Sequence, residues 1–376
     1  MKLLVPAPTR EGEQRVAIVP STVGRFTAAG FTVQVQSGAG DAAFATDEAY
    51  REAGAEIVTD LDAALAAADI VATVRPLDPA HAAKLKRGAV SVSFLGANDA
   101  DTIRALQGAG ASALSFDYLP RISRAQSMDA LTSQALVTGY RAALVGAQEQ
   151  PKFFPMFMTA AGTITPAKVL VLGAGVAGLQ AIATAKRLGA KVSAYDVRPA
   201  SADEVKSMGA TFITLELDQL EGSGGYAREM TEDRAAKQRE LLTPYVADAD
   251  VLITTAAVPG RRAPMLVTRD MVQTMKPGSV VVDLASETGG NVEGSVAGET
   301  INLNGVTVWG AKDVASSMPV HASQLFAMNV LNLLALTVKD GEVVVDVEDE
   351  VLDGCAIVLD GVIRNENVKA AMEGGA

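Results

Sequence analysis

The chain has 376 residues, of which 49% are hydrophobic, and it contains 34 glycines and 15 prolines. This length exceeds what a single hydrophobic core usually supports, so we expect two globular domains. The formal net charge of −12 makes nucleic acid an unexpected partner, because an acidic chain repels phosphate backbones. The single cysteine, Cys355, rules out an internal disulfide and a thiolate metal cluster, and we expect no metal site.

In the first third of the chain, short β-branched runs alternate with alanine-rich segments of helical period. This alternation predicts βαβ units around a mainly parallel sheet. Strands are expected at residues 2–6, 32–36, 70–74, 90–95 and 113–116, and helices at 21–29, 47–53, 61–67 and 100–108.

A second α/β series follows a long predicted helix at residues 127–150. The predicted fold class is therefore α/β, with two Rossmann-like doubly wound parallel-sheet domains. Strand-like pieces at 342–347 and 356–359 come after the second sheet is complete, so we expect the chain to return to the first domain; a loosely packed tail is the alternative. The expected domains are 1–130 with 330–376, and 131–329; strands are expected at 169–172, 192–195, 211–215, 251–255, 280–284 and 307–309, and a long helix at 321–338.

We expect no direct insertion into a membrane. The apolar start of the chain is too short for a signal peptide and meets Pro6 at once. The longest apolar stretch, residues 325–338, is interrupted by Asn329 and Asn332 and is shorter than the roughly 20 residues that span a bilayer.

The strongest local motif is a glycine-rich turn between a predicted strand and a predicted helix. Gly173 permits the tight turn, Gly175 lets a pyrophosphate approach the backbone, and Gly178 lets the helix pack closely on the strand. N–H groups at the start of the helix, near Val176, would face the phosphates. The motif predicts a dinucleotide site; a purely structural glycine turn is the alternative.

An acidic residue indicates which dinucleotide is bound. Asp196 follows the next predicted strand, 18 residues beyond Gly178, where a carboxylate would accept hydrogen bonds from the adenosine ribose. This favours NAD(H), because the carboxylate would also repel the 2′-phosphate of NADP. Arg198 lies two residues later and could accommodate that phosphate, so the discrimination is incomplete.

Most nicotinamide-dependent dehydrogenases use a general acid or base, commonly a histidine. The two histidines here, His81 and His321, fall in a polar loop and at the start of a predicted helix, which favours a structural interpretation of both. A lysine base is an alternative that no motif marks. Direct hydride transfer between two nicotinamide rings needs neither group, because no proton moves at the reacting carbons and the protein supplies only position.

Residues 120–129, Pro-Arg-Ile-Ser-Arg-Ala-Gln-Ser-Met-Asp, carry a resemblance to a known family. The stretch resembles the Arg-Gln-Asp loop of the NAD(H)-binding component of proton-translocating nicotinamide nucleotide transhydrogenase; a charged linker with a helix cap is the alternative. Thr132 stands where a serine is usual in that family. The resemblance covers nearly the whole chain, including residues 10–20, 158–162, 173–190, 224–227 and 283–291.

The resemblance implies two domains facing each other across a cleft, a homodimer, and NAD(H) bound on the second domain. Arg121 and Asp129 would hold the nicotinamide carboxamide, and Gln126 would hydrogen-bond the nicotinamide ribose. Residues 222–238 resemble the family's mobile loop; a simple solvated loop is the alternative. Catalytic roles are thus expected for Arg121, Gln126 and Asp129, and cofactor contacts for Arg121, Ile122, Ser123, Arg124, Gly173, Gly175, Val176, Gly178, Asp196, Val197, Arg198, Gly225, Tyr226, Gln238 and Ala257.

The resemblance also implies partners. Membrane segments are lacking, as in the split bacterial arrangement, where an NADP(H)-binding subunit and a membrane-spanning subunit are separate polypeptides. The expected activity is that of a Si-face transhydrogenase, active only with those subunits and located in the cytoplasm, peripheral to the inner membrane.

Two other functions compete with this interpretation. Alanine dehydrogenase is similar in both domains, but its chemistry needs a lysine and a histidine where this chain has Arg75 and Gly96. Neither residue can pass a proton, since arginine stays protonated and glycine has no side chain. An NADH-binding regulatory module without turnover is the second alternative. The Arg-Gln-Asp loop argues against it, because a sensor has no need to present the edge of the nicotinamide ring outward.

Overall fold

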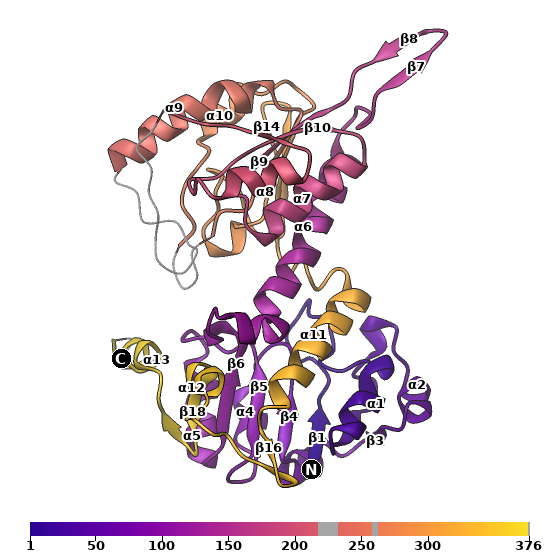
Figure 1. The fold of residues 1–376 in the computed structure, drawn as a ribbon, viewed down its shortest axis with the longest axis vertical. Coiled ribbons are helices and arrows are strands. Elements are labelled where there is room, and N and C mark those ends of the chain that lie inside the picture. Colours follow the sequence, from indigo (N-terminus) through magenta and orange to yellow (C-terminus); the bar gives the residue numbers. More distant parts are fainter. Residues whose placement is uncertain (217–231, 258–261, 375–376) are drawn as a thin grey trace. The chain divides into compact units, whose positions relative to one another are not determined.

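The computed structural model describes residues 1–216, 232–257 and 262–374 (Figure 1). The chain divides into two compact units, unit 1 with residues 1–134 and 315–376, and unit 2 with residues 135–314. The chain passes from unit 1 to unit 2 inside helix α6, Ala130–Glu149, and returns to unit 1 by a second crossing just before helix α11, Pro319–Leu334. The second crossing is 15 residues earlier than the predicted boundary at 329/330.

The packing of α11 explains this difference. Phe326 of α11 lies 5.6 Å from Phe94 and 5.2 Å from Phe116, measured between ring centroids, in the main core of unit 1. Ala327, Val330 and Leu334 of the helix are buried in the same core. The helix is therefore part of unit 1 along its whole length, although its sequence pattern could not say which domain it covers.

The sheet of unit 1 has the strand order β19-β18-β6-β5-β4-β1-β2-β3. The strands from β6 to β3 are parallel, and β18 and β19 are antiparallel additions at the opposite edge, so the C-terminal segment is part of the sheet and not a loose tail. The strands are β1 (Lys2–Val5), β2 (Thr32–Gln36), β3 (Glu56–Val58), β4 (Ile70–Ala72), β5 (Val90–Ser93), β6 (Ser112–Ser115), β18 (Ala356–Leu359) and β19 (Val362–Ile363).

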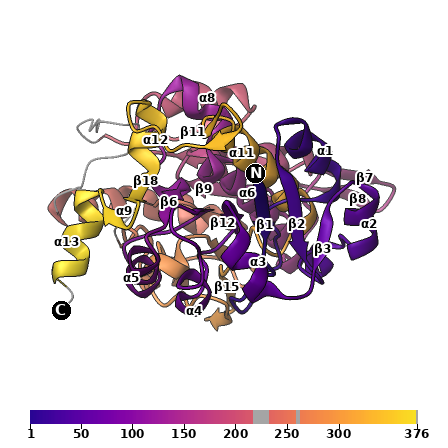
Figure 2. The same ribbon diagram turned by 90° about the horizontal axis from the view of Figure 1, so that it is seen from below.

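Both faces of this sheet are covered. Along β1, Leu3 and Val5 enter one core and Leu4 enters the other, because successive side chains of a strand point to opposite faces. Helices α1 and α11 lie on the first face, and α3 and α5 on the second, and Figure 2 shows β1, β2 and β3 side by side between them. Besides α11, the α-helices of unit 1 are α1 (Pro20–Ala28), α2 (Asp47–Glu52), α3 (Leu61–Ala67), α4 (Pro79–Ala82), α5 (Ala100–Ala109), α12 (Glu350–Cys355) and α13 (Glu366–Gly374).

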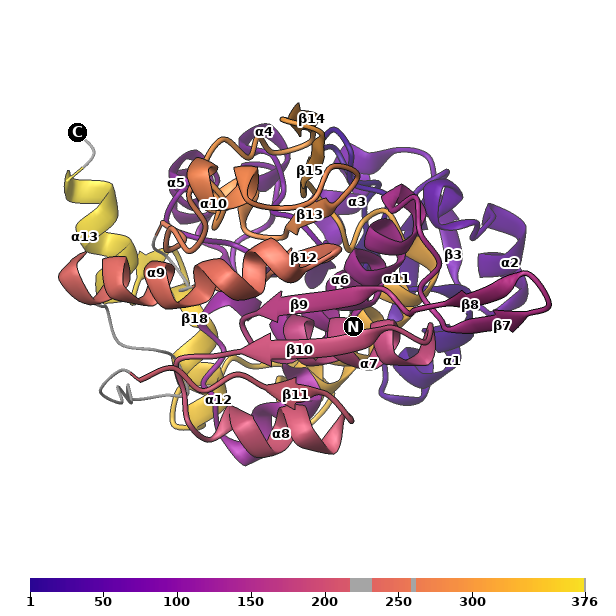
Figure 3. The ribbon, with the colours of Figure 1, turned by 90° about the horizontal axis from the view of Figure 1, so that it is seen from above.

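The sheet of unit 2 has the order β11-β10-β9-β12-β13-β15-β14 (Figure 3). Six strands are parallel, as predicted, and β14 is an antiparallel edge strand that the sequence analysis did not anticipate. The elements are β9 (Lys168–Leu172), α7 (Val176–Arg187), β10 (Lys191–Tyr195), α8 (Ser201–Ser207), β11 (Thr211–Phe212), α9 (Glu232–Asp248), β12 (Val251–Thr254), α10 (Arg269–Gln273), β13 (Val280–Asp283), β14 (Thr300–Leu303) and β15 (Val306–Gly310).

Two glycines in the part of helix α6 that belongs to unit 2 allow close packing against other elements of this unit. A Cβ atom on Gly139 would lie 2.0 Å from the carbonyl oxygen of Ala177 in α7, and one on Gly146 would lie 2.8 Å from Val251 in β12. Because glycine has no side chain, α6 packs directly against α7 and β12 at these positions.

Two small hairpins complete the described structure. Strands β7 (Phe157–Thr159) and β8 (Gly162–Ile164) pair with each other and are exposed along their whole length, and β16 (Val338–Lys339) pairs with β17 (Glu342–Val343). In the described part of the chain, no helix is both long enough and apolar enough to span a membrane.

Candidate nucleotide site

In the glycine-rich turn at the end of β9, two of the three glycines cannot be replaced without a shift of the neighbouring atoms. Gly173 has a φ of +101°, and a Cβ atom there would lie 2.5 Å from the hydroxyl oxygen of Thr255. A Cβ atom on Gly178 would lie 1.9 Å from the carbonyl oxygen of Gly173. The start of α7 therefore sits directly on the end of β9, as the sequence predicted.

Gly175 has a different environment, because no atom of the described residues, its chain neighbours apart, lies within 4 Å of the Cβ position. It precedes α7, whose first turn has no side-chain cap, so backbone N–H groups at this end are open to a ligand. These groups and the helix dipole favour an anion. The turn thus fits a dinucleotide pyrophosphate, with space for the ligand at Gly175 and rigid packing at Gly173 and Gly178.

Asp196 lies at the end of β10 and ties this strand to the glycine turn. Its Oδ2 accepts a hydrogen bond from the backbone N–H of Ala174 at 2.7 Å. The side chain of Arg198 donates to both carboxylate oxygens, from Nε at 2.9 Å and from Nη2 at 3.0 Å, and the backbone N–H of Arg198 donates to Oδ1 at 2.8 Å. The structure thus brings three of the predicted elements together: the turn, the acid and the arginine.

This pairing changes the expected role of Asp196. Its carboxylate, whose side chain is 8% exposed, already accepts four hydrogen bonds, about as many as a carboxylate can. The hydroxyls of a ribose could reach it only by displacing Arg198. The ion pair also occupies the guanidinium that an NADP 2′-phosphate would need.

The neighbouring tyrosine cannot act as an acid or base near neutral pH. Burial, together with the nearby Asp196 carboxylate, raises the pKa of Tyr195 to about 12. The phenol therefore stays protonated at neutral pH.

A buried carboxylate organises the loops on the other side of the turn. Asp283, at the end of β13, is fully buried and accepts hydrogen bonds from Thr254 Oγ1, Ala285 N and Asn291 N. Asn291 then holds the loop after β12, since its side chain accepts from Ala256 N and donates to the carbonyl of Ala256. The sequence analysis noted residues 283–291 only through the family resemblance and did not find this support.

The remaining predicted cofactor contacts of unit 2 lie near or beyond these loops. Ala257 lies after β12, directly before residues 258–261, which lie outside the described residues, and it is exposed. Gln238 is buried within α9. Gly225 and Tyr226 lie outside the described residues, so both contacts remain predictions. Of the predicted mobile loop, residues 222–231 lie outside the described residues, and residues 232–238 belong to helix α9. Val176 is the first residue of α7, within the glycine turn, and Val197 lies between Asp196 and Arg198 in the sequence.

The predicted Arg-Gln-Asp segment belongs to unit 1. Residues Ser123–Met128 form a 3₁₀ helix. Within this helix, the side chains of Ala125 and Met128 are buried, and Gln126 is exposed. Arg121 is exposed as well, Ile122 is half-buried and Ser123 is exposed. A side chain in the position of Gln126 is open to a ligand or a partner.

Asp129 caps helix α6. Its Oδ1 accepts from the backbone N–H of Thr132 at 2.9 Å, and its Oδ2 accepts from the Thr132 hydroxyl at 2.6 Å. The hydroxyl that Thr132 retains in place of the family's serine therefore has a function in orienting this carboxylate. Arg124 forms a bidentate ion pair with Asp349, at 2.5 and 2.8 Å, which holds the guanidinium away from a cofactor role unless that pair opens.

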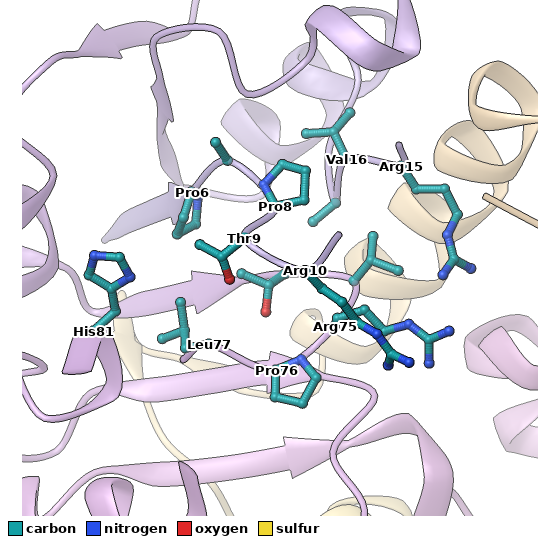
Figure 4. Close-up of a pocket in the computed structure, with 14 residues that line it drawn as sticks. Pro6, Pro8, Thr9, Arg10, Arg15, Val16, Arg75, Pro76, Leu77 and His81 are labelled. Carbon is teal, nitrogen blue, oxygen red and sulfur yellow. The ribbon is translucent and has the colours of Figure 1, made fainter. Parts of the chain in front are cut away.

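Unit 1 contains a pocket at the end of β1 and β4, lined by several cationic side chains including Arg10, Arg15 and Arg75 (Figure 4). Arg15 is fully engaged: it pairs with Glu13 through two hydrogen bonds, at 2.6 and 2.8 Å, and donates to Gln134 at 2.9 Å. Burial raises the pKa of Glu13, but the hydrogen bonds and charge of Arg15 outweigh it and hold that pKa below its usual value.

The loop position predicted for His81 is wrong, but nothing here contradicts the structural interpretation of this residue. His81 lies in the short helix α4 and lines the pocket, and its Nδ1 is 2.6 Å from Asp78 Oδ2. Asp117 was missed altogether: partial desolvation raises its pKa to about 6, against the opposing charge of Arg75, although the residue keeps solvent exposure. Gly96 and Arg75, where alanine dehydrogenase would need a histidine and a lysine, supply no proton carrier.

Comparison with known proteins identifies the family. The family model described as alanine dehydrogenase/PNT, N-terminal domain, matches residues 4–138, and the C-terminal domain model matches residues 142–366. An NAD(P) transhydrogenase alpha-subunit protein of Rhodospirillum rubrum is 46% identical over 374 residues, which cover 96% of this chain and 97% of that protein. The chain belongs to the NAD(P) transhydrogenase alpha-subunit family.

Other members and relatives agree with this assignment. The transhydrogenase alpha subunit of Haemophilus influenzae is 44% identical, over 96% of this chain and 71% of that subunit. A solved transhydrogenase structure from Sinorhizobium meliloti matches with a TM-score of 0.85 at 38% identity, over 98% of this chain and all of that one. The predicted α/β fold class with two Rossmann-like domains is confirmed.

Alanine dehydrogenases are more distant relatives of this transhydrogenase-family chain. The enzyme of Bacillus subtilis is 32% identical over 77% of this chain and 71% of its own length. A solved L-alanine dehydrogenase structure has a TM-score of 0.82 at 24% identity, over the full length of both chains, which shows a shared fold.

Substituting the glycines of the turn should separate binding from folding. Gly175→Ala should fold normally and weaken NADH binding by about tenfold or more, because its methyl group occupies the space for the phosphates. Gly178→Ala should lower the free energy of unfolding by about 1–3 kcal/mol, because its methyl group overlaps the Gly173 carbonyl. NADH fluorescence titration and urea unfolding measure the two effects. Wild-type NADH affinity in Gly175→Ala would mean that the phosphates bind elsewhere.

Removing the charge of Asp196 should change nucleotide preference. Asp196→Asn releases the Arg198 guanidinium for the 2′-phosphate, so NADPH affinity should rise by about tenfold, the value of one charge-assisted hydrogen bond, and NADH affinity should change less. Binding of both nucleotides is measured by isothermal titration calorimetry. Asp203→Asn, an exposed carboxylate on α8, is the matched control and should change neither affinity. An unchanged ratio of the two affinities in Asp196→Asn contradicts this assignment.

Proposed function

We propose that this chain binds NAD(H) at the glycine turn of unit 2 and presents the nicotinamide ring for direct hydride transfer to NADP⁺ held by a partner subunit. The observation that carries the proposal is the open position at Gly175, framed by two tightly packed glycines and by Asp196 at the end of the next strand. The extensive match to the transhydrogenase alpha subunits supports this function over other NAD(H)-dependent reactions.

The chemistry requires position rather than proton transfer. The dihydronicotinamide ring supplies the hydride, and ring-to-ring transfer leaves no proton to move at the reacting carbons. Arg121 and Asp129 would hold the carboxamide, with the carboxylate of Asp129 already fixed by Thr132. Gln126 would hydrogen-bond the nicotinamide ribose at the face that meets the partner, and its exposure supports that role.

The remaining assignments concern the assembly. The word "subunit" in the name of the Rhodospirillum rubrum relative implies further polypeptides, and we assign to them the NADP(H) site and the membrane-spanning proton channel. Transfer would be of the Si-face type and coupled to proton translocation only through these partners. The chain would then lie in the cytoplasm, peripheral to the inner membrane.

Reconstitution tests the proposed function. Mixed with an NADP(H)-binding subunit of this family, the chain should transfer hydride from NADH to NADP⁺, measured as NADPH formation. Gln126→Ala should cut this rate by about tenfold or more at saturating NADH while leaving NADH affinity nearly unchanged, because only the ring alignment is lost. Gln148→Ala, an exposed glutamine on α6, is the control.

Three outcomes discriminate the alternatives. Absence of transhydrogenation combined with turnover of alanine and NAD would establish the dehydrogenase instead. Gln126→Ala that changes NADH affinity alone would favour a regulatory module. A rate loss at constant affinity supports the transhydrogenase.

A homodimer is a further element of the proposal, and the β7–β8 hairpin supports it. Phe157, Met158 and Ile164 are 42%, 78% and 43% exposed, and residues 153–167 carry no charged side chain. An isolated two-stranded hairpin is marginally stable in water, so this arm needs a surface to pack against. A second copy of the chain fits, because a two-fold dimer would bury both arms in equivalent ways.

A charge placed on the arm should dissociate the dimer. Met158→Lys puts an ammonium group into the proposed contact, so the mass measured by light scattering should fall from dimer to monomer at micromolar concentration, with NADH binding retained. Met208→Lys, an exposed methionine of the same unit at the end of α8, should remain dimeric. A monomeric wild-type protein, or a dimeric Met158→Lys protein, contradicts the assignment.

A further inference from the structure

Two asparagines interrupt the otherwise apolar helix α11, and both contact the segment that carries Gln126. Asn329 is 6% exposed, and its Nδ2 donates to the carbonyl oxygen of Ser127 at 3.0 Å. Asn332, one turn later at the helix surface, donates from Nδ2 to the same oxygen at 2.9 Å. Ser127 is the residue directly after Gln126 and two before Asp129. One carbonyl thus receives two side-chain hydrogen bonds, which use both of its lone pairs.

The other end of the Asn329 side chain is also held. Its Oδ1 accepts from the Ser133 hydroxyl at 2.7 Å, and that hydroxyl accepts from Gln134 Nε2 at 3.2 Å. Ser133 and Gln134 belong to α6, which Asp129 caps. The amide of Asn329 therefore connects α6 to the 3₁₀ helix that precedes it.

The connection continues to a buried ion pair. Gln134 donates to the carbonyl of Ala322 in α11 at 3.1 Å and accepts from Arg15 at 2.9 Å. Arg15 is paired with Glu13, whose side chain is 1% exposed. A continuous set of hydrogen bonds thus runs from Glu13 to Ser127 within unit 1. Such networks are rigid when every member has a partner.

Along α11, the neighbours Phe326, Val330 and Leu333 are buried apolar residues. The buried amide of Asn329 is favourable among them only because its hydrogen bonds are made. These hydrogen bonds fix the position and orientation of the 3₁₀ helix relative to α6. Burial of a polar side chain against a backbone carbonyl one residue from Gln126 is an arrangement suited to orienting that residue.

We propose that Asn329 is a positioning residue for hydride transfer: its Nδ2 fixes the carbonyl of Ser127 and through it the direction of the Gln126 side chain. The inference rests on the proposed function of the Arg-Gln-Asp segment and adds a residue of another helix to it. Asn332 supplies the same hydrogen bond from a more exposed position and contributes less.

Asn329→Asp tests the proposal, because it keeps the acceptor for Ser133 and replaces the donor to Ser127 by an oxygen. With the NADP(H)-binding subunit present, the hydride-transfer rate at saturating NADH should fall by about tenfold or more, while the NADH dissociation constant changes by less than about threefold. Amide hydrogen exchange of residues 123–129 should accelerate in the same variant. Asn332→Ala, which leaves the core intact because it lies near the surface, should reduce the rate by about two- to threefold.

Ser323→Ala is the matched control. Ser323 is a buried polar residue of the same helix, and its hydroxyl accepts from Val16 N at 3.0 Å, away from Ser127. Whatever stability this variant loses, its rate and the exchange of residues 123–129 should stay at wild-type values.

The outcomes separate this inference from the proposed function. A wild-type chain without transhydrogenation overturns both. An active wild type with unchanged rate and exchange in Asn329→Asp overturns the positioning role alone, as does an equal loss of rate in Ser323→Ala. If Asn329→Asp does not fold, a wild-type rate in Asn332→Ala overturns the positioning role, and a loss of about two- to threefold at constant NADH affinity supports it.

Discussion

The contact between Gly178 and the carbonyl oxygen of Gly173 is the constraint on which the nucleotide site depends. It brings the first turn of α7 onto the end of β9, so that the free N–H groups of the helix point to the open space at Gly175. Thr255, at the end of β12, closes the same turn by donating its hydroxyl to the Gly173 carbonyl at 3.0 Å. Any side chain at either glycine would separate these elements.

Several carboxylates of the glycine-turn region, the Arg-Gln-Asp segment and the pocket of unit 1 form hydrogen bonds or ion pairs within the protein. Asp196 is paired with Arg198, Asp129 with Thr132, and Glu13 with Arg15. A carboxylate held by several donors is well suited to fix the backbone around it. This distribution of charge agrees with a reaction in which the protein orients two rings and does not supply an acid or a base.

Sequence patterning predicted the regular core well, because there the hydrophobic period and the burial coincide. The strand Thr32–Gln36 and the helix Leu61–Ala67 were predicted with the residues that the structure has. The hairpin of β7 and β8 was missed, since an arm that is exposed on both faces has no alternation to detect. The edge strands Glu56–Val58 and Thr300–Leu303 were missed for a related reason: both are partly polar and half-exposed.

For the site, the sequence predicted which residue types are needed but not how they pair. The glycine turn and Asp196 were found because their spacing reflects a local strand-turn-helix geometry. The bond between Asp196 and Arg198 depends on the conformation of the chain after β10, and the support from Asp283 depends on loops that are distant in sequence. Asn329 was noticed only as a polar interruption, because its partner, Ser127, lies 202 residues away.

The central claim is that hydride passes directly from one nicotinamide ring to the other. NADH carrying deuterium on the transferred position of C4, mixed with NADP⁺, this chain and its NADP(H)-binding partner, tests it most directly. The account predicts that the deuterium appears in NADPH in full and that none enters the water, because no proton carrier intervenes. Loss of the label to solvent, or its appearance in an organic product other than NADPH, would contradict the account.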